Sequence, residues 1–128
     1  VAMKPGKPLV YGRVGETDFI GLPGNPVSAF VTFCLFVRPF LLKRMGATDV
    51  LYRAFAVQAD FAWSKPGARR EFLRARLQAN GKLALFPNQS SGVLTSCVWA
   101  DGLLDLEVGQ TVRPGDWVRF IPFSELLA

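Results

Sequence analysis

The stretch Leu22-Pro23-Gly24-Asn25-Pro26-Val27-Ser28 combines residue types that can begin a helix and present its first turn to an anion. Gly24 permits a tight turn, Asn25 stands where an N-cap belongs, and Pro26 suits the first helical position. Ser28 then falls in the first turn, where its hydroxyl and the free backbone N–H groups face the same space. Helix N-termini of this kind attract anions. A well-capped helix without a ligand explains the same residues.

Two lysines lie on a rigid turn near the beginning of the chain. Lys4 and Lys7 flank Pro5-Gly6, which holds their ammonium groups near one loop. In an α/β layer this loop and the start of the following helix could converge on one anion. Two solvated surface lysines are the alternative interpretation.

The elements that would position these groups follow from local patterns. Before residue 48, the patterns predict two strands joined by a turn and then one long helix, at residues 9–14, 18–22 and 26–45. Apolar residues surround the helix almost completely, so we expect it to be covered on most sides, and Pro39 predicts a kink. Gly46 suits the end of the helix.

After residue 48 the pattern changes to short strands separated by turns. Six strands are predicted, at residues 51–58, 71–78, 82–86, 94–99, 103–108 and 116–121. Asn80-Gly81 favours a hairpin with a two-residue turn between the second and third of these strands. The sequence therefore predicts an α+β fold, a hairpin plus a long helix followed by a small C-terminal β-barrel, with a boundary near residues 47–50.

Composition narrows the classes of function. The chain has 128 residues and a net charge of +5, with the basic excess concentrated before residue 48, which suits a small anion better than a nucleic-acid track. It contains no histidine, and Cys34 and Cys97 are predicted to be small buried hydrophobes, so we expect no metal site in this chain. Arg38-Pro39 breaks the longest apolar run, so we expect no membrane span and a cytoplasmic protein.

Several of these motifs together carry a family resemblance. Lys4-Pro5-Gly6-Lys7-Pro8 and the stretch around Ser28 are followed, in order, by Arg70-Glu71-Phe72-Leu73-Arg74-Ala75, Asn88-Gln89-Ser90-Ser91-Gly92, Ala100-Asp101-Gly102-Leu103 and Gly115-Asp116-Trp117-Val118. This ordered set resembles the C-terminal half of the molybdopterin molybdenumtransferases, the MoeA family, which includes the E domain of gephyrin.

The resemblance implies an activity and an assembly. Its members insert molybdenum from molybdate into adenylyl-molybdopterin, with release of AMP, in a magnesium-dependent step. Residues 1–48 would be the end of the α/β domain that holds the pterin nucleotide, and residues 49–128 the C-terminal β-barrel domain. The resemblance also implies a homodimer, with other proteins of molybdenum-cofactor biosynthesis as further candidate partners. Neither nucleic acid nor a membrane is expected as a partner.

The resemblance also assigns site residues. It gives positioning and electrostatic roles around molybdate to Lys4, Lys7, Ser28, Arg74 and Ser91, and it makes Pro23, Gly24, Asn25 and Pro26 the loop that binds the pterin substrate. Ammonium, guanidinium and hydroxyl groups suit a dianion, and the sulfurs of the substrate would be the nucleophiles. Taken alone, Arg74 could instead be a surface arginine paired with Glu71 or Asp105, and Ser91 a turn residue whose role Ser90 could share.

One expectation about activity follows from the resemblance, and two other functions are compatible with the sequence. The family's glycine-rich pterin loop and magnesium ligands are expected outside this sequence, so we expect the chain alone to be inactive. A non-catalytic barrel that binds a partner peptide, as in the gephyrin relatives, is the main alternative. A small nucleic-acid-binding barrel is the third possibility, and steep salt dependence of binding would support it.

Overall fold

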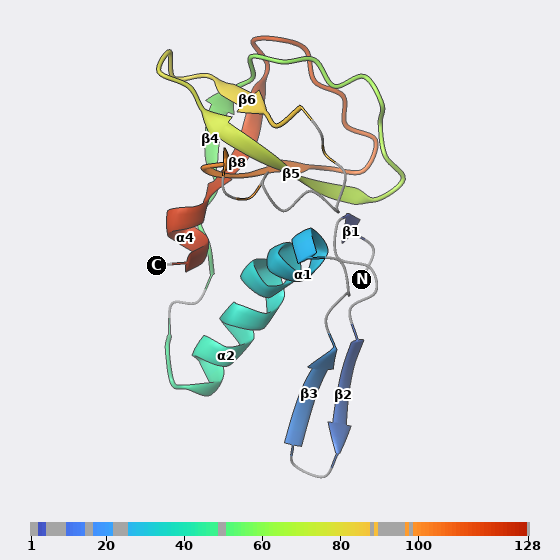
Figure 1. Cartoon of the computed structure of the whole chain (residues 1–128), viewed down its shortest axis with the longest axis vertical. Coiled ribbons are helices and arrows are strands. Elements are labelled where there is room, and N and C mark those ends of the chain that lie inside the picture. The colour runs from blue at the N-terminus through green and yellow to red at the C-terminus, as the bar shows by residue number, and fades with distance from the viewer. Residues whose placement is uncertain are drawn as a thin grey trace.

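A curled sheet and a long helix form the two main layers of the fold (Figure 1). The structure is a computed structural model that describes residues 3–4, 10–14, 17–21, 26–48, 51–87, 89, 97 and 99–127, with side chains from residue 29 onward. Strands β2 (Val10–Val14) and β3 (Thr17–Gly21) form an antiparallel hairpin with Val14 opposite Thr17. The hairpin extends away from the sheet in Figure 1, and it confirms the predicted one.

The long helix consists of α1 (Pro26–Thr32), the π-helical segment η1 (Phe33–Val37) and α2 (Arg38–Arg44). In η1 the Arg38 N–H donates to the carbonyl oxygen of Phe33, five residues back. Pro39 has no backbone N–H to donate, so the α-helical hydrogen-bond pattern is interrupted at this residue. The wider π-helical turn lies directly before it. Gly46, with a φ of 93°, follows the helix. The predicted helix is confirmed, and its interruption lies at η1.

One side of this helix packs on the sheet. Val31, Cys34 and Leu35 are buried in a cluster shared with the strands. Phe36 and Leu41, in contrast, remain 39% and 45% exposed. The described part of this chain therefore covers only part of the helix, and the expected cover over the rest stays a prediction.

The six-stranded sheet has the order β1-β5-β7-β8-β4, with β6 also paired to β5. Its strands are β1 (Met3–Lys4), β4 (Phe55–Gln58), β5 (Arg70–Leu77), β6 (Leu83–Leu85), β7 (Gly102–Leu106) and β8 (Trp117–Pro122). All the pairings are antiparallel except that of β1 with β5. The short helix α4 (Phe123–Leu127) follows β8.

The sheet curls into a half-barrel. Its far edges touch at one bridge between Ala59 and Leu83, where the Asp60 N–H donates to the Leu83 carbonyl oxygen at 2.8 Å. The predicted barrel is therefore an open, curled sheet joined at this bridge. The predicted division between residues 1–48 and 49–128 stays a prediction, although β1 belongs to the same sheet as the later strands.

Two local predictions were wrong. Cys97 and Trp99 are helical, whereas residues 94–99 were predicted as a strand, because a short apolar run does not distinguish a buried strand from a helical turn. The β5–β6 turn is also longer than two residues. Gln78 N–H donates to the Lys82 carbonyl oxygen, and Gly81 adopts a φ of 81°, as in a three-residue turn with a left-handed last position.

The core has two parts on opposite faces of the sheet. Inside the half-barrel, Leu73 and Ala75 of β5 pack with residues such as Leu104 and Phe120. On the other face, Phe72 of β5 packs with the helix. Phe72, Leu73 and Ala75 of β5 therefore face the helix or the barrel interior according to their parity. No helix within the described ranges combines the length and apolar character of a membrane span.

Candidate anion site between the sheet and the helix

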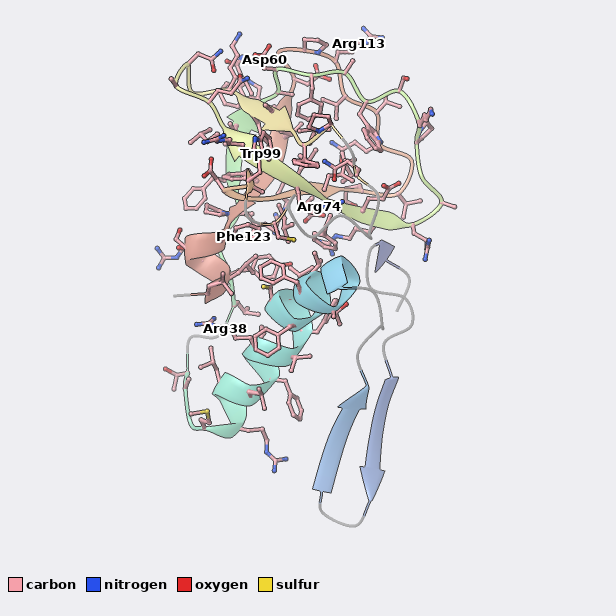
Figure 2. All side chains as sticks on the ribbon, viewed as in Figure 1. Arg38, Asp60, Arg74, Trp99, Arg113 and Phe123 are labelled. Atoms are coloured by element: carbon pink, nitrogen blue, oxygen red, sulfur yellow. The ribbon has the colours of Figure 1, made fainter. Side chains whose placement is uncertain are left out.

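Strand β5 supplies the central cation of the candidate site. Leu73 and Ala75 face the barrel interior, and Phe72 faces the helix. Arg74 has the same parity as Phe72, so its side chain projects from the helix-facing side of the sheet. Figure 2 shows Arg74 where the sheet meets the N-terminal end of α1.

Arg74 is buried at this layer, with only 1% of its surface exposed. Burial, which disfavours the charged form, lowers the pKa of Arg74, and the nearby Cys97 thiol acts in the opposite direction. An arginine still stays protonated under ordinary conditions. The interpretation of Arg74 as a surface arginine is therefore wrong. A buried guanidinium at a layer boundary is suited to binding an oxyanion through two parallel hydrogen bonds.

Two further predicted residues lie on elements next to β5. Lys4 is in β1, opposite Glu71, three residues from Arg74 along the strand. Ser28 is the third residue of α1, whose later residue Val31 packs in the same cluster as Phe72. The structure thus places the backbone of Lys4 on the strand next to β5, in register with Glu71 rather than with Arg74. It places the backbone of Ser28 in the helix that packs on the Arg74 face of β5.

The other predicted site residues are not all described. Pro26 is the first residue of α1, as predicted. Lys7, Pro23, Gly24, Asn25 and Ser91 lie outside the described residues. The complete set of site residues therefore stays a prediction.

Gln89 contacts the site strand, although sequence reasoning assigned it no role. Its Oε1 accepts from the Arg74 N–H at 3.1 Å, and its Nε2 donates to the Arg74 carbonyl oxygen at 3.0 Å. Nε2 also donates to the carbonyl oxygen of Phe86 at 2.9 Å. The position of Gln89 in the motif Asn88-Gln89-Ser90-Ser91-Gly92 was the only signal in the sequence, and it did not reveal these bonds.

A second charged group occupies the same face of the sheet, on the neighbouring strand. Asp105 of β7 is buried and lies in ion pairs with Arg70 and Arg119. Glu71, the other acid considered for Arg74, has the opposite parity on β5 and packs against Gly67. The buried carboxylate of Asp105 thus has two cationic partners that the sequence did not predict.

A magnesium site built from protein side chains alone would need several ligands close together, whereas many magnesium sites use only one or two carboxylates with waters and substrate phosphates. No group of three or more histidine, cysteine, aspartate or glutamate side chains comes together among the described residues. The described part of this chain therefore offers no magnesium site made from a cluster of its own side chains.

Comparison with known proteins identifies relatives for almost the whole chain. Residues 56–123 match the family model of the MoeA C-terminal region, domain IV. The chain is 38% identical over 107 residues to molybdopterin molybdenumtransferase 2 of Mycobacterium tuberculosis, covering 83% of this chain and 26% of that protein. It is 33% identical over 133 residues to the molybdopterin molybdenumtransferase of Haemophilus influenzae, covering 99% and 33%.

Solved structures agree with these sequence relatives. A molybdopterin biosynthesis moeA protein from Pyrococcus horikoshii superimposes with a TM-score of 0.77 at 28% identity, over 95% of this chain and 30% of that one. The curled sheet and helix are therefore the arrangement found in that protein. The chain spans about a quarter to a third of the length of these two curated relatives.

Proposed function

This chain belongs to the MoeA family, and we propose that it forms one wall of the site where the whole protein inserts molybdenum from molybdate into adenylyl-molybdopterin, with release of AMP. The chain spans only part of its relatives, so the reaction is proposed for the protein that carries it in full. The 128-residue chain alone is proposed to be inactive.

The burial of Arg74 at the sheet–helix layer is the observation that supports this proposal most directly. Molybdate is a dianion, and a guanidinium held in a dry, preorganised position stabilises negative charge more strongly than one in water. In the proposal, Lys4, Lys7 and the hydroxyls of Ser28 and Ser91 complete the anion site. The first turn of α1 adds backbone N–H groups, which favour the same charge.

These groups hold and orient the substrates and do not transfer protons. The sulfurs of the pterin substrate supply the nucleophiles. Magnesium, which the family resemblance implies, would be bound by residues outside this set. The role left to this chain is to place molybdate beside the pterin and to stabilise the charge that the reaction redistributes.

The experiment compares Arg74→Ala with Arg113→Ala in the full-length protein. Arg113 is exposed, and Figure 2 shows it at the end of the half-barrel away from the helix. We expect Arg74→Ala to lower molybdate-dependent AMP release by about a hundredfold, and Arg113→Ala to leave it unchanged. Equal activity of the two variants would contradict the proposed site.

The proposal also includes a homodimer, as the family resemblance implies, and a location in the cytoplasm. Light scattering on the full-length protein tests the assembly, and a measured monomer mass at micromolar concentration would contradict it. Cell fractionation tests the location.

A peptide-binding module is the second candidate function, because one specific surface favours it. Strand β4 pairs with β8, and a groove of about 320 Å³ along these strands is lined by Ala54, Phe55, Ala56, Trp117, Val118 and Arg119. Trp117 is 68% exposed and Phe55 48% exposed. An extended peptide could add to this edge and place apolar side chains against the aromatics. Loss of binding to a peptide array in Trp117→Ala, but not in Val108→Ala, would support this function, and equal loss or no binding would oppose it.

A further inference from the structure

One edge of β5 is shared by two short strands that do not meet. Its N-terminal end pairs with β1 at Arg70 and Glu71, and its C-terminal end pairs with β6 from Ala75 onward. The opposite edge of β5 is continuously paired with β7. The peptide groups of Arg74 therefore face a break in the strand pairing, although Phe86 N–H donates to the Arg74 carbonyl oxygen at 3.1 Å.

The side chain of Gln89 fills this break. It accepts from the N–H and donates to the carbonyl oxygen of the same residue, Arg74, which are the two bonds that a strand residue would make. Its second N–H donates to the Phe86 carbonyl oxygen and so links Gln89 to the residue that directly follows β6. A neutral carboxamide carries the donor and the acceptor that this position requires, whereas a carboxylate carries acceptors only.

We infer that Gln89 is a positioning residue for the anion site, through its hold on the backbone of Arg74. This inference rests on the proposed function. The direction in which the Arg74 guanidinium projects depends on the orientation of its own peptide groups, because the side chain leaves from the same Cα. The guanidinium is almost fully buried, so a small rotation of β5 at this point would displace it without an easy adjustment in solvent.

The inference predicts distinct effects of two near-isosteric substitutions. Gln89→Met removes all three hydrogen bonds and leaves a side chain of similar length. Gln89→Glu keeps acceptors for the Arg74 N–H but places carboxylate oxygens against two carbonyl oxygens. Protonation of the substituted carboxyl group would restore one donor, so the defect of Gln89→Glu, measured relative to the unsubstituted protein, should shrink as the pH is lowered.

The test measures molybdate-dependent AMP release by the full-length protein. We expect Gln89→Met to lower kcat/KM about tenfold to a hundredfold. Gln110→Met is the matched control, because Gln110 also accepts from a backbone N–H, that of Glu107, but in an exposed turn. The control should retain normal kcat/KM.

A double-substitution cycle separates positioning from general structural damage. If Gln89 acts through Arg74, Gln89→Met should add less than about twofold to the defect of Arg74→Ala, whereas a general loss of stability would multiply the two effects. Multiplicative effects, or normal kcat/KM in Gln89→Met, would overturn the inference. If Arg74→Ala is impaired while Gln89→Met is normal, the inference fails and the proposed function stands. Normal activity of Arg74→Ala itself would contradict both the inference about Gln89 and the proposed function.

Discussion

Arg70 holds both carboxylate oxygens of Asp105, with Nε donating to Oδ1 at 2.8 Å and Nη2 to Oδ2 at 2.5 Å. Arg119 approaches the same Oδ2 from β8 at 3.1 Å. The hydrogen bond to Asp105 is the largest cause that raises the pKa of Arg70 above its ordinary value. The buried carboxylate thus joins three neighbouring strands, β5, β7 and β8, on the face of the sheet that also carries Arg74 and Phe72.

Asp105→Asn should destabilise the chain, because it removes the charge that two arginines share and keeps the side-chain volume. Breaking buried ion pairs costs several kcal/mol, but Arg70 and Arg119 are 40% and 56% exposed and can regain water. We therefore expect a loss of about 1–3 kcal/mol in the free energy of unfolding, measured by urea denaturation. Arg119→Ala should cost less, since Arg119 makes the single, more exposed contact. An unchanged urea midpoint for Asp105→Asn would contradict this account.

Gly102→Ala should be among the more damaging small substitutions in this sheet. A Cβ at Gly102 would lie 2.2 Å from the carbonyl oxygen of Ile121 and 2.8 Å from the Cα of Pro122, both backbone atoms of β8. Backbone in a paired strand cannot move aside cheaply, and overpacking of this kind typically costs about 1–3 kcal/mol.

Gly67→Ala is the matched control for Gly102→Ala. Its Cβ would meet mainly the end of the Glu71 side chain, which can rotate away. Thermal unfolding of the two variants provides the comparison, and we expect a clearly lower Tm for Gly102→Ala. A larger drop for Gly67→Ala would show that the close approach of β8 is not the limiting contact.

The sequence predicted those features that are encoded locally. Pro26 and Gly46 mark the two ends of the helix because proline is preorganised for the first turn and glycine readily adopts the positive φ that follows the last. The β2–β3 hairpin and most of the barrel strands follow from short apolar runs between turn residues. For the same reason, the candidate residues for an anion site could be named before any fold was known, and their role stays a prediction.

The remaining features depend on contacts between distant parts of the chain. Arg74 is buried on the face of β5 that packs against the helix, and strand periodicity alone does not specify which face that is. The pairing of Lys4 with Glu71 joins positions that are far apart in the sequence. The bonds of Gln89 to Arg74 replace part of a strand with a side chain, and no sequence pattern distinguishes this from an ordinary turn residue.

Thr32→Val should leave stability unchanged or raise it. The Thr32 side chain is fully buried, and its hydroxyl has no hydrogen-bond partner among the described residues. An unsatisfied buried hydroxyl costs free energy, so replacing it with a methyl group of similar shape should raise the free energy of unfolding by up to about 1 kcal/mol. Thr32→Ser keeps the hydroxyl and removes the methyl group, so urea denaturation should show it to be less stable than Thr32→Val. A clear loss of stability in Thr32→Val would mean that the hydroxyl is bonded in the folded protein.

Cys34 should make the stability of the chain fall between about pH 9 and pH 11. Burial, followed by the neighbouring Cys97 thiol, raises the pKa of Cys34 from its ordinary 9.0 to about 11, against the effect of Arg38. Between these two values the unfolded thiol is ionised and the folded thiol is still protonated. Unfolding then releases a proton, so the full stability below pH 9 is lost progressively as the pH rises, by about 3 kcal/mol in all.

Comparison of variants isolates this contribution from the other groups that titrate in alkali. Cys34→Ala lacks the thiol, so its free energy of unfolding, measured by urea denaturation at about pH 8, 9.5 and 11, should fall less steeply with pH than that of the unsubstituted chain. Val37→Ala removes buried carbon from the same helical segment without removing a titrating group, and it should lower stability equally at every pH. Parallel pH curves for Cys34→Ala and the unsubstituted chain would show that the buried thiol ionises as easily in the folded state as in the unfolded one.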